Sequence, residues 1–177
     1  MNREKKANVS QQGFTLLELI VVLAIAVTIF AMATPSYIRW RESVEYRTSA
    51  GNIAAVLREA RSRTIVSNLQ HRVEFEMSVP PAPPGPTGRY RMTRGERAAN
   101  SQTWITVIQD WTAVPVSVTL SLIDLTANPG NNSIDFNTSG TANIANLATA
   151  ATITVRERTG TPRYTIEVSN VGRIRIL

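Results

Sequence analysis

The chain has 177 residues, of which 43% are hydrophobic and 18% are charged, which suits one modest folded domain with an appendage better than two full domains. It contains no cysteine, which excludes a disulfide framework and a thiolate metal site. The formal net charge is +6, and every basic residue after Lys6 is an arginine.

The arginine bias has two readings. Arginine binds carboxylate and phosphate as a planar two-point donor, so the bias is compatible with anionic or polymeric partners. A genome rich in G and C or a hot environment explains the same bias without any partner. Composition alone leaves both open.

Residues 14–34 form the first predicted element. From Phe14 to Ala33 the only ionisable side chain is Glu18, and 20 such residues at about 1.5 Å each cross about 30 Å of hydrocarbon. The small residue Gly13 precedes this apolar run, whereas a secretory signal carries its cleavage site after the run. Cleavage after Gly13 would remove a basic leader, residues 1–13, and leave Phe14 as a new N-terminus on a single membrane-spanning helix.

The run Gly13-Phe14-Thr15-Leu16-Leu17-Glu18, followed by apolar residues and Pro35, resembles the class III leader and N-terminal helix of type IV pilins and type II secretion pseudopilins. The resemblance implies cleavage between Gly13 and Phe14 by a prepilin peptidase, N-methylation of Phe14, and a role for Phe14 and Glu18 in joining other pilin subunits in a filament. It also implies a bacterial inner-membrane anchor with a periplasmic head, and then a periplasmic or surface filament.

Physical chemistry supports a role for Glu18. A carboxylate in hydrocarbon costs about 2.5 to 3.5 kcal/mol unless it is paired or lies near the interface. The ammonium of Phe14 in a neighbouring subunit would lower that cost only when the two subunits are in register. The alternative is a solvated acid at a helix start, where the helix dipole also favours negative charge.

Residues 35–68 are predicted to continue the helix as an amphipathic half. Pro35 removes a backbone donor, so a kink or local melting is expected there, and Gly51 is the weakest point. The apolar stripe predicted to pack against the head comprises Tyr37, Trp40, Val44, Ile53, Val56, Leu57 and Ala60.

Residues 52–75 resemble the H-type pseudopilin and FimT group (GspH/FimT), in which an Ala-Arg pair, here Ala60 and Arg61, precedes the first strand. Thr64 stands where that group usually has alanine. Arg58, Arg61 and Arg63 are interpreted as a solvated face near Glu59.

Residues 69–177 are predicted to form a β-rich head. Seven or eight short stretches rich in β-branched and aromatic residues alternate with turns, which predicts an α+β subunit with an antiparallel head of two packed sheets. The segments IDFNTSG and SNVGRIRIL resemble the H-type pseudopilin domain. Residues Pro80 to Gly88 are predicted to form a proline-rich loop.

Neither catalysis nor a cofactor is expected. His71 is the only histidine, and no nucleophile–base set, zinc helix, phosphate loop or calcium loop is present. Trp104 and Trp111 differ in strand parity, which predicts that one lies in the core and the other is partly exposed.

The C-terminal GRIRIL predicts that Ile174 and Ile176 enter the core, while Arg173 and Arg175 point outward. Arg156 and Arg158 alternate in the same way, so a basic surface would form if their strands were neighbours. Gly172, Arg173 and Arg175 resemble the ending of FimT-type minor pilins, which implies binding of double-stranded DNA during natural transformation.

Two functions therefore remain. The first is a minor pseudopilin or pilin that initiates or joins a type IV filament, most like an H-type pseudopilin of type II secretion. The alternative is a FimT-like minor pilin that binds extracellular DNA through weak, salt-sensitive phosphate contacts. A solvated edge strand protected by charge explains the same arginines.

Overall fold

The structure is a computed structural model that describes residues 15–77, 88–123, 132–143 and 150–177. It divides into two compact units, Met1–Trp40 and Arg41–Leu177. The proline-rich loop expected at Pro80 to Gly88 lies outside the described residues except for its last glycine.

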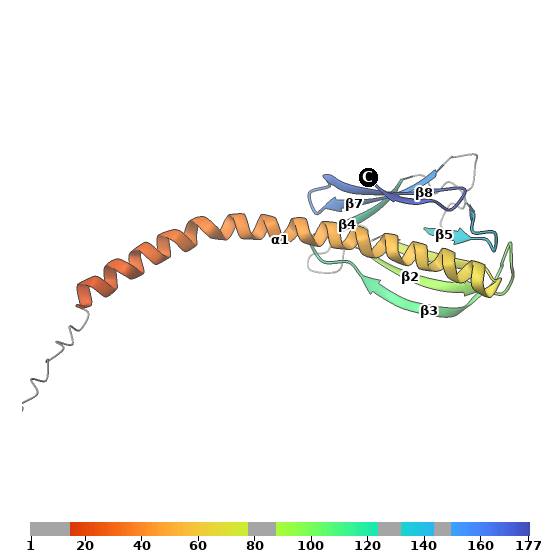
Figure 1. Cartoon of the computed structure of the whole chain (residues 1–177), viewed down its shortest axis with the longest axis horizontal. Helices are drawn as coiled ribbons and strands as arrows, with labels where there is room; N and C mark the ends of the chain where they lie inside the picture. The colour runs from red at the N-terminus through yellow and green to blue at the C-terminus, as the bar shows by residue number, and fades with distance from the viewer. Residues whose placement is uncertain (1–14, 78–87, 124–131, 144–149) are drawn as a thin grey trace, which may run out of the picture. The chain divides into compact units, whose positions relative to one another are not determined.

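A single helix, α1 (Leu16–Ser67), contains the two halves expected from the sequence (Figure 1). It runs without interruption through Pro35, so the expected local melting is wrong. Thr34 donates its hydroxyl to the Phe30 carbonyl at 2.8 Å just before the proline. The helix ends where Asn68 adopts a positive φ of 54°, a conformation that asparagine tolerates better than most residues.

The second unit contains two antiparallel sheets, as predicted. The first has the strand order β3-β2-β1-β5-β6. Its strands are β1 (His71–Met77), β2 (Gly88–Gly95), β3 (Trp104–Ala113), β5 (Ser133–Phe136) and β6 (Ala142–Asn143).

The second sheet has the order β4-β7-β8-β9. Its strands are β4 (Val118–Ile123), β7 (Ala150–Glu157), β8 (Pro162–Ser169) and β9 (Ile174–Ile176). The described residues thus hold nine strands, against the seven or eight expected, because the two-residue strand β6 is too short to show a period.

One hydrophobic core joins the second half of α1 to both sheets. Ile53, Leu57 and Ala60 from the helix are fully buried, and the same cluster includes Val73 of the first sheet and Ile153 of the second. The predicted apolar stripe is therefore correct from Ile53 onward. It is wrong for its first three members, since Tyr37, Trp40 and Val44 are exposed.

Both head tryptophans lie on the outer face of the first sheet, and neither belongs to the core, so the expectation of one buried tryptophan is wrong. The guanidinium of Arg72 lies 3.9 Å from the Trp104 ring centre, and that of Arg91 lies 4.6 Å from the Trp111 ring centre. Three register shifts between β2 and β3 change the strand parity, so residues of odd separation share one face.

Candidate functional site

The start of α1 is capped by its own sequence. The amide of Glu18 donates to the Thr15 hydroxyl oxygen at 3.3 Å, and the amide of Leu19 donates to the Thr15 carbonyl at 3.2 Å. Threonine followed three residues later by glutamate is the pattern of a capping box, a signal that the sequence analysis missed. Gly13 and Phe14, the expected cleavage and methylation residues, lie outside the described residues.

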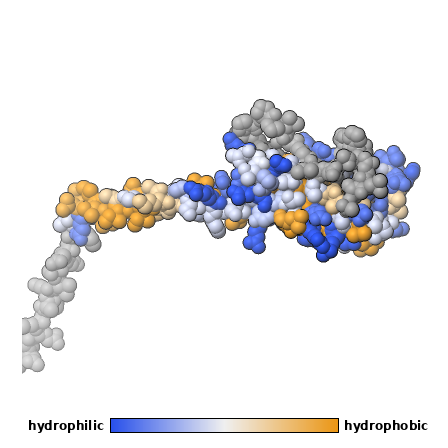
Figure 2. All heavy atoms as spheres, turned by 90° about the horizontal axis from the view of Figure 1, so that it is seen from above, coloured by the Kyte–Doolittle hydropathy of each residue, from blue (hydrophilic) through white to orange (hydrophobic). Residues whose placement is uncertain are grey.

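The first half of α1 is long and apolar enough to cross a membrane. Its best 18-residue window has a mean hydropathy of 2.7, and none of that window is buried within the chain. Apolar side chains cover the visible face of this half in Figure 2. Large side chains such as Leu16, Val27 and Phe30 are exposed, so their apolar surface is available to lipid or to other helices.

The C-terminal arginines lie at the edge of the second sheet. Arg173 and Arg175 are both exposed, and Arg175 is opposite Glu167 in the register of β9 with β8. Ile174 packs against the core as predicted, whereas Ile176 remains 40% exposed, so its predicted burial is wrong.

Arg156 and Arg158 lie away from this edge. Arg156 donates to the Ser121 hydroxyl at 2.8 Å and to the Gly160 carbonyl at 3.2 Å, while Arg158 is exposed in the turn after β7. Strand β8 separates β7 from β9, so the condition that these strands be neighbours is not met. On β8 the partners of Arg156 and Arg175 are Pro162 and Glu167, about 16 Å apart along an extended strand.

Three distant segments that carry the family resemblance meet around Arg61. Its Nε donates to the Gly140 carbonyl at 2.9 Å, and its terminal nitrogen donates to the Val171 carbonyl at 3.4 Å. Arg58 and Arg63 are exposed as expected, but Arg61 is half-buried and binds two loops. The interpretation of Arg61 as a solvated residue is therefore wrong, because its guanidinium binds the turns at Gly140 and Val171.

Thr64, which departs from the family pattern, also has a structural partner. Its hydroxyl donates to the Ala60 carbonyl at 2.8 Å and lies 3.2 Å from Nδ1 of the buried His71. That nitrogen also lies 3.0 Å from the Leu69 carbonyl, so we assign Nδ1 as the protonated nitrogen, donating to both oxygens. Burial is the main cause that lowers the pKa of His71, which keeps the imidazole neutral.

Within the described part of the chain, no group of three or more histidine, cysteine, aspartate or glutamate residues could hold a metal ion. The features available for interaction are an apolar helix with a single acid at its start, a packed head, and two separated pairs of arginines. These are features of an assembly or binding protein.

Comparison with known families gives two matches. Residues 49–172 match the family described as "Type II transport protein GspH", and residues 8–34 match the "Prokaryotic N-terminal methylation motif". The first match covers most of the chain, and the second covers the predicted leader and the first half of α1. No curated protein matches the chain.

One solved structure shares the fold, and two others are similar at lower TM-scores. The minor pseudopilin EpsH from the Type 2 Secretion System of Vibrio cholerae superposes with a TM-score of 0.53 at 15% identity, covering 75% of this chain and 96% of EpsH. The type IV minor pilin FimU of Pseudomonas aeruginosa, in two crystal forms, gives TM-scores of 0.45 and 0.47 at 14% and 16% identity. These alignments cover 74% and 78% of this chain and 91% and 92% of FimU.

Proposed function

The chain belongs to the GspH family of type II transport proteins, and on that premise we propose that its helix α1 enters a filament through Phe14 and Glu18. As a member of this family it is a minor pseudopilin, a structural and non-enzymatic protein. The methylation motif implies processing by a prepilin peptidase, and the family implies assembly with other pseudopilin subunits.

The observation that carries the proposal is the exposed apolar surface of the first half of α1. None of the described residues buries this apolar helical surface of membrane length, and Glu18 is the only ionisable residue between Phe14 and Ala33. The cap at Thr15 uses the backbone amide of Glu18. The Glu18 carboxylate has no hydrogen bond or ion pair with any described residue. A carboxylate in this position gains most from a cation supplied by another molecule.

The Phe14 ammonium of a neighbouring subunit is the cation that we propose. This ammonium exists only after cleavage between Gly13 and Phe14. A subunit that is not cleaved therefore cannot form the ion pair that aligns it with its neighbour. Before assembly, the methylation motif and the apolar helix are consistent with anchoring in the inner membrane. We place the head on the periplasmic side, from which the subunit passes into a periplasmic or surface filament.

The test replaces Glu18 by alanine in the full-length protein, produced together with the other components of a type II secretion system. We expect Glu18→Ala to insert into the membrane normally and to be strongly depleted from the sheared filament fraction. The matched control is Glu42→Ala, which removes an exposed acid farther along the same helix and should leave incorporation unchanged.

Intact mass of the membrane-extracted protein tests the processing step separately. The expected mass is that of a chain beginning at N-methylated Phe14. Retention of residues 1–13 in the presence of a prepilin peptidase would contradict the processing step, and wild-type incorporation of Glu18→Ala would contradict the pairing step.

DNA binding is a second candidate, favoured by the exposure of Arg173 and Arg175 and by the absence of ion pairs to either residue within the described part of the chain. Two phosphate contacts predict weak binding whose affinity falls with salt with a slope of about 2. A gel-shift titration of the full chain in nonionic detergent should lose binding on Arg173→Gln with Arg175→Gln, but not on Arg58→Gln. Binding that is undetectable at low salt would exclude this candidate.

A further inference from the structure

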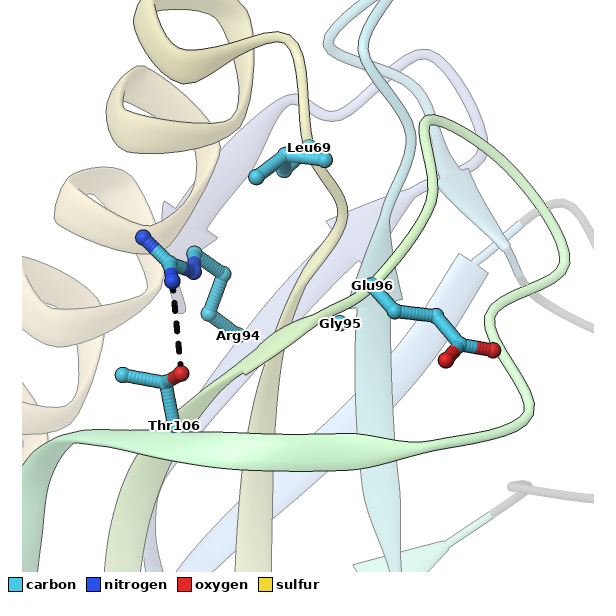
Figure 3. A pocket seen from close by; sticks show the side chains of 5 residues that line it. All are labelled: Leu69, Arg94, Gly95, Glu96 and Thr106. Atoms are coloured by element: carbon cyan, nitrogen blue, oxygen red, sulfur yellow. Dashed lines mark hydrogen bonds between the residues drawn. The ribbon is translucent and has the colours of Figure 1, made fainter.

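A hollow lies beside the C-terminal end of α1, at the edge of the helix-facing side of the first sheet. It measures 250 Å³ and is lined by Leu69, Arg94, Gly95, Glu96 and Thr106 (Figure 3). Its lining residues come from the segment after α1, which ends at Ser67, and from the end of the β2–β3 ladder, where Gly95 pairs with Trp104.

Arg94 stands out among the half-buried arginines of the described residues. Its side chain makes one hydrogen bond to the described residues, a 3.3 Å contact from a terminal nitrogen to the Thr106 hydroxyl, although a guanidinium has five N–H donors. The others all reach carboxylate or carbonyl oxygens: Arg61, Arg72, Arg91 and Arg156. Arg94 therefore retains donors for a ligand.

Arg94 has no ion pair with a carboxylate among the described residues. Glu96 does not neutralise it, because its carboxylate is turned away from Arg94 in Figure 3 and is paired with Arg97 at 3.5 Å. The charges of Arg63 and Arg94 both help to lower the pKa of the neighbouring His71. A half-buried guanidinium without a carboxylate partner favours an anionic ligand.

The lining and the single positive charge of the hollow favour a carboxylate over a phosphate. Leu69 supplies an apolar wall next to the guanidinium (Figure 3), which suits a side chain with methylene groups. One guanidinium balances one negative charge and presents two parallel donors to a carboxylate, whereas a phosphate dianion would remain half neutralised.

We propose that this hollow binds a carboxylate side chain, aspartate or glutamate, of another protein, with Arg94 as its two-point donor and Leu69 as its apolar contact. This interaction does not depend on how α1 assembles. It gives the head its own means of recognising an acidic partner.

The experiment is a side-chain NMR titration of the full-length protein in nonionic detergent, following Arg94 Nε–H and the amides of Gly95 and Thr106. The probe is the peptide acetyl-Gly-Glu-Gly-amide, compared with acetyl-Gly-Gln-Gly-amide, acetate and inorganic phosphate. We expect saturable shifts with the glutamate peptide and affinities lower by about tenfold or more for the other three, because each lacks the charge, the chain or the matching geometry.

Variants assign the effect to Arg94. Arg94→Gln should abolish the shifts of Gly95 and Thr106, and Arg94→Lys should weaken binding by about tenfold because lysine keeps the charge but lacks the planar fork. The matched control, Arg58→Gln, removes an exposed arginine of α1 that does not line the hollow and should bind as the wild type does.

Three outcomes would overturn the proposal: shifts that do not saturate, binding that survives Arg94→Gln, and equal affinity for acetate or phosphate, which would mean adventitious anion binding only. If Arg94→Gln does not give the spectrum of a folded protein, Arg94→Lys provides the test. Wild-type affinity of Arg94→Lys for the glutamate peptide would then contradict the proposal that Arg94 is a two-point donor. None of these results depends on filament assembly, so this proposal and the role of Glu18 can fail separately.

Discussion

Gly172 packs directly against Gly140, since a Cβ atom on Gly172 would lie 2.0 Å from the Gly140 carbonyl oxygen. Both glycines have positive φ values, 76° and 77°, and the Arg61 guanidinium binds the Gly140 carbonyl from the helix side. The Gly-Arg ending that resembles the FimT group therefore includes a residue with a structural task. Gly172 closes the last turn onto the head.

We predict that Gly172→Ala destabilises the protein by about 3 kcal/mol or more, because the new methyl group meets backbone atoms and the left-handed conformation becomes strained. Gly160→Ala is the control: φ is 94° there, but nothing lies within 4 Å of the added Cβ, so only about 1 kcal/mol is expected. Denaturant unfolding of the full chain in detergent measures both. Equal losses would show that the close approach does not matter.

Gly51→Ala should have the opposite sign. Gly51 lies inside α1 and an added Cβ meets nothing within 4 Å, so alanine improves helix propensity without a clash. The expected gain is about 1 kcal/mol in the free energy of unfolding. A loss of stability in the same unfolding measurement would indicate that the helix surface at Gly51 is already covered in detergent, for example by another copy.

His71 should make stability depend on pH. Burial, together with the charges of Arg63 and Arg94, lowers its pKa in the folded protein, against a smaller opposing effect of the Leu69 carbonyl. The unfolded chain then binds a proton more readily, so this contribution is complete above about pH 6.5 and is lost as the pH falls through the lowered pKa.

Thermal unfolding at pH 7.5, 6.5 and 5.5 measures this dependence. The wild type should lose stability across the interval, whereas His71→Gln should start less stable and change less. The hydrogen bond from Arg163 lowers the pKa of Glu157 from its usual value of 4.5. Glu157 therefore changes the stability only below the pH interval of this measurement. Parallel curves for the two proteins would assign the pH dependence to other groups.

The ion pair between Arg72 and Asp135 should contribute far more to stability than its surface counterparts. Two hydrogen bonds of 2.6 and 2.7 Å join the side chains, which are only 12% and 15% exposed. Asp135→Asn should cost about 3 kcal/mol, since it leaves the guanidinium largely desolvated without its counterion.

Glu59→Gln provides the comparison for that ion pair. It breaks the Arg63–Glu59 pair, in which the side chains are 49% and 47% exposed, and should cost about 0.5 kcal/mol or less. Urea unfolding of both variants at low and high salt tests the difference. A similar small cost for the two substitutions would mean that the Trp104 ring, not Asp135, holds Arg72 in place.

The features that local pattern determines were predictable from the sequence. The apolar and amphipathic halves of the helix, the buried positions from Ile53 onward and the two antiparallel sheets follow from hydrophobic periodicity, whereas the continuity of the helix through Pro35 does not. The exposure of Tyr37 and Trp40 was not predictable, because helical spacing shows that a face is apolar without showing where the covering sheet begins. Register shifts in β3 likewise invalidated a parity argument that assumed a regular strand.

The candidate sites show the same division. Thr15 and Glu18 are three residues apart, so their cap was readable from the sequence. Arg61 binds turns 79 and 110 residues later in the chain, and no local pattern reports such pairings. The separation of Arg156 from Arg175 depends on β8 lying between their strands, which is a property of the sheet order.

The strand order has a consequence for how the head folds. The chain enters the first sheet, passes to the second at β4, returns at β5 and crosses again at β7, so β7, β8 and β9 join the second sheet only after the chain has passed every strand of the first. His71 pairs with Phe136, far along the chain, and such non-local pairing slows folding. Strand β9 pairs with β8 at the edge of the second sheet, so this sheet is complete only after the turn at Gly172 has formed.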